Sequence, residues 1–287
     1  MAETISDFDG SIVEASRMVL LEVVSLLADY GRDVVVVGGT APEFLMPNAS
    51  DRYIGTSDVD LAIRPERLDI PSFMKMKKLL EAHGYQWLPD RFAFAREVVV
   101  GGQAITVKVD ILTSNSKEGK LDPQTGKPFM VWGFKAPGCE LALDAADTVV
   151  IDGRLPDGHR SSATIQVAGI VAFLVMKANA LCARERSRYK DAWDIDYCLG
   201  HYPGGIDEIV LRMKQRIGDP VVIDALRKLR RKFASPADEG PRFVADFEEI
   251  ADQEDHEMRC RRAYERVREM LDQVERDADL SASDQGQ

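Results

Sequence analysis

The feature that most constrains this chain is a run of four valines at residues 34–37, followed directly by Gly38 and Gly39. Four consecutive β-branched residues predict a short strand that is buried on both faces. Two glycines allow a tight turn in which the backbone comes close to another group. Thr40 is placed to cap a following helix, with Pro42 in its first turn. This order of elements predicts a mixed α/β structure for the N-terminal half.

The remaining patterns divide the chain into a mixed half and a helical half. The first half shows helical periodicity and strand-like alternation in turn, whereas almost everything after residue 168 is helical. We therefore expect an α+β fold. A domain over residues 1–150 has a small mixed β-sheet and flanking helices, and a mainly helical domain follows over residues 151–287. The expected helices are 12–30, 71–83, 168–183, 188–199, 206–217, 219–232 and 255–275, and the expected strands are 34–37, 57–63, 92–100, 104–112, 148–151 and 162–167.

Composition excludes several classes of protein. No apolar run reaches the roughly 20 residues that span a bilayer, and the N-terminus lacks a basic segment, so we expect a cytoplasmic protein that does not bind membranes. The 4 cysteines and 4 histidines are scattered, which leaves little basis for a His/Cys metal centre or a Ser-His-Asp site. A bound metal would then be held by carboxylates, which favours Mg²⁺ or Mn²⁺. A net charge of −11 argues against a nonspecific nucleic-acid binder.

Three acids lie in the predicted strands of the mixed half. Asp58 and Asp60 are two residues apart, so on a strand their side chains share one face. Neighbouring carboxylates repel each other unless a cation lies between them, and a divalent ion that carries nucleotide phosphates meets that need. Asp110 on an adjacent strand would complete a three-carboxylate cluster suited to phosphoryl displacement. The alternative is a strand end with two solvated acids.

A second group of charged residues lies in the helical half. Lys177 interrupts an apolar helix, and Asp191 and Asp194 follow at a spacing that places them on one helix face. A lysine inside an apolar helix requires an acidic partner or a phosphate. The alternative is a lysine that extends to the surface beside a salt-bridged helix.

These motifs together resemble a known family. Gly38-Gly39-Thr40-Ala41, Arg52 and Thr56-Ser57-Asp58-Val59-Asp60-Leu61 resemble the opening motif of the polymerase-β-like nucleotidyltransferase superfamily. Lys177 and the run Lys190-Asp191-Ala192-Trp193-Asp194-Ile195 are similar to the AbiEii/MenT group, the toxins of type IV toxin–antitoxin and abortive infection systems. The resemblance covers roughly residues 20 to 200.

The resemblance implies a reaction and assigns roles in it. An NTP and Mg²⁺ (or Mn²⁺) are the expected cosubstrates, NMP is moved to an acceptor such as the 3′ end of tRNA, and a cognate antitoxin is an expected partner. Asp58 and Asp60 would be metal ligands, and Asp110 would bind metal or activate the attacking hydroxyl. Asp191 or Asp194 would orient Lys177 or the acceptor. The implied nucleotide-binding residues are Gly38, Gly39, Thr40, Arg52, Ser57 and Lys177.

Two other functions fit the same residues. One is a nucleotidyltransferase that modifies a drug or a metabolite, and the other is an inactive nucleotide-sensing or antitoxin-binding module. Residues 212–232 contain 8 Lys or Arg and 2 Asp. Arg227, Arg230 and Arg231 lie at helical spacing, so we expect them to share a face that contacts an RNA backbone, the alternative being an ordinary solvated helix. Residues 113–138 have the composition of an inserted loop or arm.

Overall fold

The computed structural model describes residues 4–114, 132–183 and 188–283. The chain divides into two compact units. One, here called the sheet unit, comprises Phe8–Phe44 and Gly55–Ala172. The other, the helical unit, comprises Met1–Asp7, Leu45–Ile54 and Phe173–Gln287. Among the described residues, no helix combines the length and the apolar character needed to cross a membrane.

The sheet unit contains a mixed, eight-stranded sheet with the strand order β3-β4-β5-β2-β1-β8-β7, and β6 pairs with β5 outside this path. At its centre, β2 runs antiparallel to β1 and parallel to β5. β8 is parallel to the other edge of β1. The strands are β1 (Val34–Val37), β2 (Val59–Ile63), β3 (Tyr85–Leu88), β4 (Ala93–Val100), β5 (Gln103–Thr113), β6 (Phe134–Lys135), β7 (Ala146–Arg154) and β8 (Arg160–Ala168).

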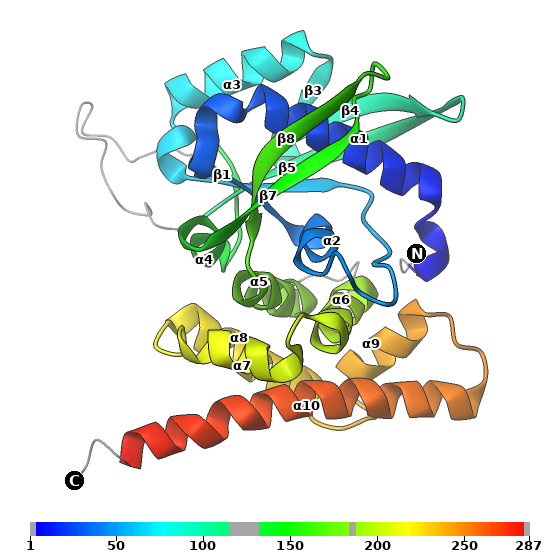
Figure 1. Cartoon of the computed structure of the whole chain (residues 1–287), viewed down its shortest axis with the longest axis vertical. Coiled ribbons are helices and arrows are strands. Elements are labelled where there is room, and N and C mark those ends of the chain that lie inside the picture. Colours follow the sequence, from blue (N-terminus) through cyan, green and yellow to red (C-terminus); the bar gives the residue numbers. More distant parts are fainter. Residues whose placement is uncertain (1–3, 115–131, 184–187, 284–287) are drawn as a thin grey trace. The chain divides into compact units, whose positions relative to one another are not determined.

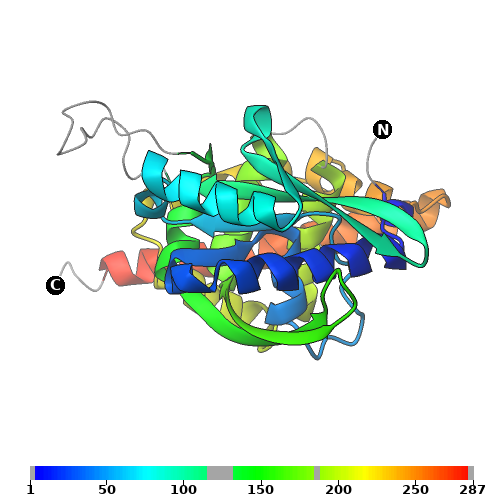
Figure 2. The ribbon, with the colours of Figure 1, turned by 90° about the horizontal axis from the view of Figure 1, so that it is seen from above.

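Helices cover both faces of this sheet. α1 (Gly10–Leu26) and α3 (Ile70–Ala82) lie across one face (Figures 1 and 2), and α4 (Cys139–Asp144) packs against β1 and β2 from the other. Asp9 caps α1, because its carboxylate accepts hydrogen bonds from the backbone N–H groups of Ser11 and Ile12. The short α2 (Ala41–Leu45) follows the glycine turn. The valines of β1 are all buried, as expected for a central strand.

The helical unit is built around α6 (Arg188–His201), in which every residue from 190 to 199 is buried. α9 and α10 pack against it, and α10 also contacts α7 and α8. Phe233 and Phe247 are fully buried in this unit. The other helices are α5 (Ile170–Ala183, of which the first three residues belong to the sheet unit), α7 (Gly205–Lys214), α8 (Pro220–Lys232), α9 (Glu239–Phe247) and α10 (Gln253–Ser283).

Several sequence-based expectations need correction. The sheet is larger than expected, because the predicted pair at 148–151 and 162–167 joins it as β7 and β8 and because β3 and β6 were missed. The first helix ends at Leu26 rather than at Tyr30, and a 3₁₀ segment over Ala28–Asp33 contains Gly31 at a positive φ of 51°. Most of the predicted arm, residues 115–131, lies outside the described residues.

The predicted helix cap at Thr40 is correct in position but not in hydrogen bonding. Gly38–Thr40 form a 3₁₀ turn, and α2 begins directly after Thr40, with Pro42 in its first turn. The hydroxyl of Thr40 is buried but has no hydrogen-bond partner among the described residues. The sequence correctly placed a turn and a helix after β1, but the side chain of Thr40 does not support that helix.

Candidate active site

The glycine turn after β1 brings the backbone against an acidic side chain. Gly38 has a positive φ of 64°, and a Cβ atom there would lie 1.9 Å from Oδ2 of Asp60. Val37, the residue before it, is the register partner of Asp60 across the β1–β2 pair. Only glycine fits such a position, because it has no Cβ and tolerates a positive φ. The structure therefore explains the first glycine of the Gly38-Gly39 pair by its approach to Asp60.

Two of the predicted acids lie side by side in the sheet. Asp60 on β2 and Asp110 on β5 are direct partners in the parallel register, so their side chains share one face. Both residues are half-buried. The backbone thus fixes two carboxylates next to each other, an arrangement that a cation would stabilise.

The third acid, Asp58, is held differently from the prediction. β2 begins at Val59, so Asp58 precedes the strand instead of lying within it. The Ser57 hydroxyl donates to the Asp58 carboxylate, and the buried Ser16 hydroxyl on α1 donates to the Asp58 backbone carbonyl over 3.2 Å. Two serines therefore fix the end of the turn that leads into β2.

The donor set can be tested against the expected metal. In the part of the chain that the structure describes, no three His, Cys, Asp or Glu side chains are gathered closely enough to hold an ion by themselves. Mg²⁺ is commonly bound by one or two carboxylates, with substrate phosphates and water completing its octahedron. The adjacent carboxylates of Asp60 and Asp110 fit that pattern of ligands, and the buried hydroxyl of Thr40 without a partner is a further polar group that a bound ligand could satisfy.

The charged residues predicted in the helical half do come together within the helical unit. Lys177 Nζ lies 2.8 Å from Asp191 Oδ1 and 2.6 Å from Asp194 Oδ2. Asp191 and Asp194 are buried, and the Lys177 side chain is 11% exposed. The predicted shared face of the two aspartates on α6 is therefore confirmed. An ammonium group has three N–H donors, so two carboxylate contacts leave one donor for a further ligand.

Two residues outside the predicted site complete this cluster. Lys190 Nζ lies 2.9 Å from Asp194 Oδ1 and 2.7 Å from the hydroxyl oxygen of Tyr53. The Tyr53 hydroxyl in turn donates to Asp194 Oδ1 over 2.7 Å. The i,i+4 spacing of Lys190 and Asp194 was visible in the sequence. No sequence signal indicated Tyr53, which lies 141 positions from its partner Asp194.

The electrostatics of the cluster follow from burial and charge. Burial alone would lower the pKa of Lys177, but the charges of Asp191 and Asp194 outweigh it, so this pKa is raised. Burial lowers the pKa of Lys190, and the nearby charge of Lys177 adds to that effect. Burial would raise the pKa of Asp194, yet the two lysines hold it below its usual range. Two lysines and two aspartates are therefore buried together, and the shifts of Lys177 and Asp194 favour the charged forms of these two groups.

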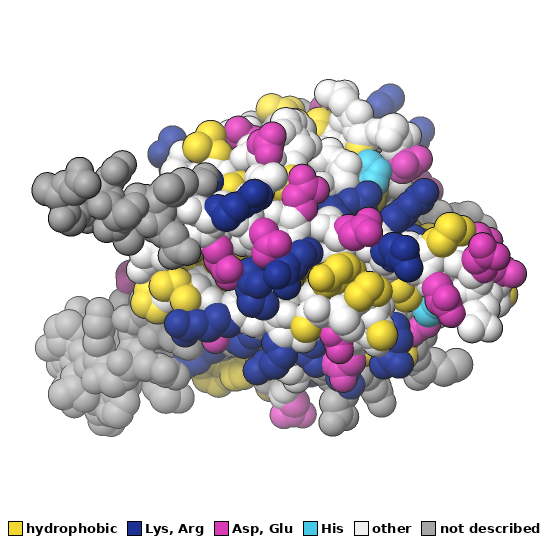
Figure 3. Space-filling view, turned by 90° about the horizontal axis from the view of Figure 1, so that it is seen from below, with side chains coloured by type: hydrophobic (Ala, Val, Ile, Leu, Met, Phe, Trp, Pro, Cys, Tyr) yellow, Lys and Arg dark blue, Asp and Glu magenta, His cyan; other side chains and the backbone are white. Residues whose placement is uncertain are grey.

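The predicted basic face on α8 needs correction. Arg227 and Arg231 are exposed, but Arg230 is paired with Asp272 and Glu275 of α10, the latter over 2.7 Å. On the surface shown in Figure 3, basic side chains are interspersed with acidic ones. The three arginines therefore do not form one free face. Arg52, predicted to bind nucleotide, is exposed in the segment Leu45–Ile54 of the helical unit.

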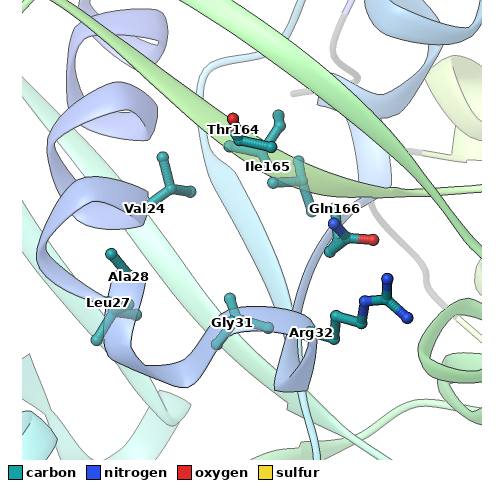
Figure 4. A pocket seen from close by; sticks show the side chains of 10 residues that line it. Val24, Leu27, Ala28, Gly31, Arg32, Thr164, Ile165 and Gln166 are labelled. Carbon is teal, nitrogen blue, oxygen red and sulfur yellow. The ribbon is translucent and has the colours of Figure 1, made fainter.

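A separate cavity of about 210 Å³ lies in the sheet unit, near the end of α1 (Figure 4). Apolar side chains form much of its wall, and none of the predicted site residues lines it. Gln166 at this cavity is already hydrogen-bonded to Thr148. The cavity is thus distinct from the carboxylates of β2 and β5. Its lining residues are Val24, Leu27, Ala28, Gly31, Arg32, Val34, Val36, Thr164, Ile165 and Gln166.

Comparison with known proteins identifies the family. A family model described as the nucleotidyl transferase AbiEii toxin of a type IV toxin–antitoxin system matches residues 24–282. None of the curated proteins matches the chain. The family match includes the glycine turn, the acids of β2 and β5 and the lysine–aspartate cluster. The chain therefore belongs to the AbiEii family of nucleotidyl transferase toxins.

Proposed function

We propose that this chain is a Mg²⁺-dependent toxin that moves NMP from an NTP to the 3′ end of tRNA, and that a cognate antitoxin restrains it in the cytoplasm. In this proposal the sheet unit is a polymerase-β-like nucleotidyltransferase domain. The observation that carries it is the approach of the Gly38 backbone to Asp60, whose register partner is Asp110. A turn without side-chain bulk beside paired carboxylates suits a phosphate chain that arrives with a cation.

Each candidate residue then has a role. Asp60 and Asp110 would hold Mg²⁺, and Asp58, which precedes β2 and accepts a hydrogen bond from Ser57, stays a candidate for a further ligand. When bound, the ion neutralises negative charge on the phosphates and acts as a Lewis acid. The Gly38-Gly39 backbone and the Thr40 hydroxyl would contact the triphosphate, with Arg52 as a further cationic contact. The Lys177 cluster contributes to the same transfer.

The proposed reaction is an in-line displacement at the α-phosphorus. The acceptor hydroxyl oxygen forms a bond to that phosphorus, the bond from the α-phosphorus to the bridging oxygen breaks, and pyrophosphate leaves. The hydroxyl proton passes to a carboxylate, for which Asp110 and Asp191 are the candidates. The remaining N–H donor of Lys177 stabilises charge on the phosphates, a contact typically worth roughly 10²–10³ in rate.

The acceptor is the part of the proposal that most needs an experiment. The purified chain is incubated with each of the four α-³²P-labelled NTPs, total tRNA and Mg²⁺, and the products are separated into RNA, protein and small molecules. We expect label at the 3′ end of tRNA from one preferred NTP, and no label when the tRNA has an oxidised 3′ terminus. Label that appears only in small molecules would contradict the tRNA acceptor and favour a metabolite-modifying enzyme. Absence of label from every fraction would contradict nucleotidyl transfer.

A further inference from the structure

The buried hydroxyl of Tyr53 occupies a central position in the lysine–aspartate cluster. Tyr53 is 8% exposed, donates a hydrogen bond to Asp194 and accepts one from Lys190. It comes from the segment Leu45–Ile54, which belongs to the helical unit. In the sequence this segment lies between the glycine turn and Asp58. A loop residue therefore contributes both a donor and an acceptor to a network otherwise formed by α5 and α6.

The contacts give the two aspartates unequal roles. Both oxygens of Asp194 are engaged, Oδ1 by Tyr53 and Lys190 and Oδ2 by Lys177 and, over 3.2 Å, by Lys190 as well. Asp191 uses only Oδ1, and its buried Oδ2 has no hydrogen-bond partner among the described residues. A buried carboxylate oxygen without a partner is costly in a folded protein. Such an atom needs an explanation, and a catalytic role with a bound ligand as its partner is one.

We propose that Tyr53 is a positioning residue of the transfer reaction. Together with Lys190 it fixes Asp194, and Asp194 in turn holds Lys177. Oδ2 of Asp191 is then left as the acceptor that the cluster offers to a substrate hydroxyl. This inference rests on the proposed function. Tyr53 itself touches no reacting group and acts through Asp194. Its hydroxyl is needed to keep Lys177 and Asp191 in one geometry while substrate is bound, because small displacements of catalytic groups lower the rate strongly.

A matched control is available in the same aromatic cluster. The Tyr53 ring lies 5.2 Å from the Tyr197 ring and 5.8 Å from the Trp193 ring, between centroids. The Tyr197 hydroxyl donates to the backbone carbonyl of Asp51 over 2.6 Å. Tyr197→Phe therefore removes a hydroxyl that ties down the same segment without touching Asp194. Tyr53→Phe removes the hydroxyl that does contact Asp194 and keeps the ring packing.

The test measures kcat and KM for the NTP in both variants, with rates normalised to the folded fraction from circular dichroism. In Tyr53→Phe we expect kcat to fall by about 10- to 100-fold while KM stays within about twofold, and Tyr197→Phe to keep the wild-type kcat. In the NMR spectrum of ¹³Cε-labelled lysines, Lys190 should lose its proton at lower pH in Tyr53→Phe only, because its ammonium has lost an acceptor.

Failure of the positioning role of Tyr53 and failure of the proposed function give different results. If the wild-type chain transfers label and the two variants have the same kcat, the positioning role of Tyr53 is wrong and the proposed function stands. An unchanged Lys190 titration in Tyr53→Phe also overturns the positioning role. If the wild-type chain transfers no label with any NTP, the proposed function itself is wrong, and the role of Tyr53 is rejected with it.

Discussion

Replacement of Gly38 by alanine tests whether the contact between the glycine turn and Asp60 serves catalysis. The new Cβ would lie 1.9 Å from Asp60 Oδ2, whereas non-bonded carbon and oxygen atoms stay more than about 3 Å apart. The Asp60 carboxylate would have to move by about 1 Å, a displacement that can lower a rate by about 10²-fold. The positive φ of 64° adds a conformational cost of roughly 1–2 kcal/mol to the folded state.

Gly101 provides the matched control for this substitution. It has a similar φ of 59°, and a Cβ there would meet nothing within 4 Å. Gly101→Ala should therefore carry the same conformational cost and leave the transfer rate unchanged. Urea denaturation measures the stability of both variants, and incorporation of α-³²P label measures the rate. Equal activity in Gly38→Ala and Gly101→Ala would refute the argument that the turn positions Asp60 for the reaction.

Three further predictions concern the helical unit. Asp196 accepts hydrogen bonds from Arg259 over 2.6 Å and from Arg266 over 2.9 Å. In urea denaturation, Asp196→Asn should lower the free energy of unfolding by roughly 3–5 kcal/mol, whereas Asp272→Asn on the surface should lower it by about 1 kcal/mol or less. Equal losses in the two variants would contradict a special role for burial. The pKa of Asp194 is lowered in the fold. The contribution of Asp194 to stability is therefore complete above its unfolded pKa of about 4 and is lost as the pH falls through the lower folded pKa. Asp194→Asn should flatten this acid-side loss of stability in urea denaturation at different pH values, and an unchanged pH dependence would argue against an ionised Asp194. The double variant Arg227→Glu/Arg231→Glu should weaken transfer to RNA without changing KM for the NTP, and the slope of log K against log salt should fall by roughly 0.7 per lost contact on single strands. Arg230→Glu should mainly destabilise α10. Unchanged RNA transfer in the double variant would place the acceptor elsewhere.

The parts of the site that could be predicted from sequence depend on local patterns. The run of valines and the glycine pair gave β1 and its turn, and the Gly101-Gly102 pair gave the hairpin of β4 and β5. Once those strands are placed, Asp60 and Asp110 need only a parallel pairing to become neighbours. The i,i+3 spacing of Asp191 and Asp194 was sufficient to place them on one face of α6.

The features that could not be predicted depend on packing between distant residues. α9 begins with Glu239, Gly240 and Pro241, which form a weak helical signal. Its helix is stabilised instead by burial, since a Cβ at Gly240 would lie 2.6 Å from the Phe233 ring and Phe247 is fully buried. Tyr53 is a similar case, because its position in the cluster depends on Asp194 far along the chain. Tertiary contacts of this kind override local propensity.

In the proposed function, the paired carboxylates beside the glycine turn carry out nucleotidyl transfer. The most direct measurement compares Mg²⁺-dependent incorporation of α-³²P label into tRNA by the wild-type chain, Asp60→Asn and Asp152→Asn. Asp152 is an exposed acid on β7 of the same sheet and serves as the control. We predict that folded Asp60→Asn loses transfer, since an amide of the same shape lacks the charge that holds a divalent ion, and that Asp152→Asn retains the wild-type rate. Near-normal transfer by folded Asp60→Asn would contradict the account.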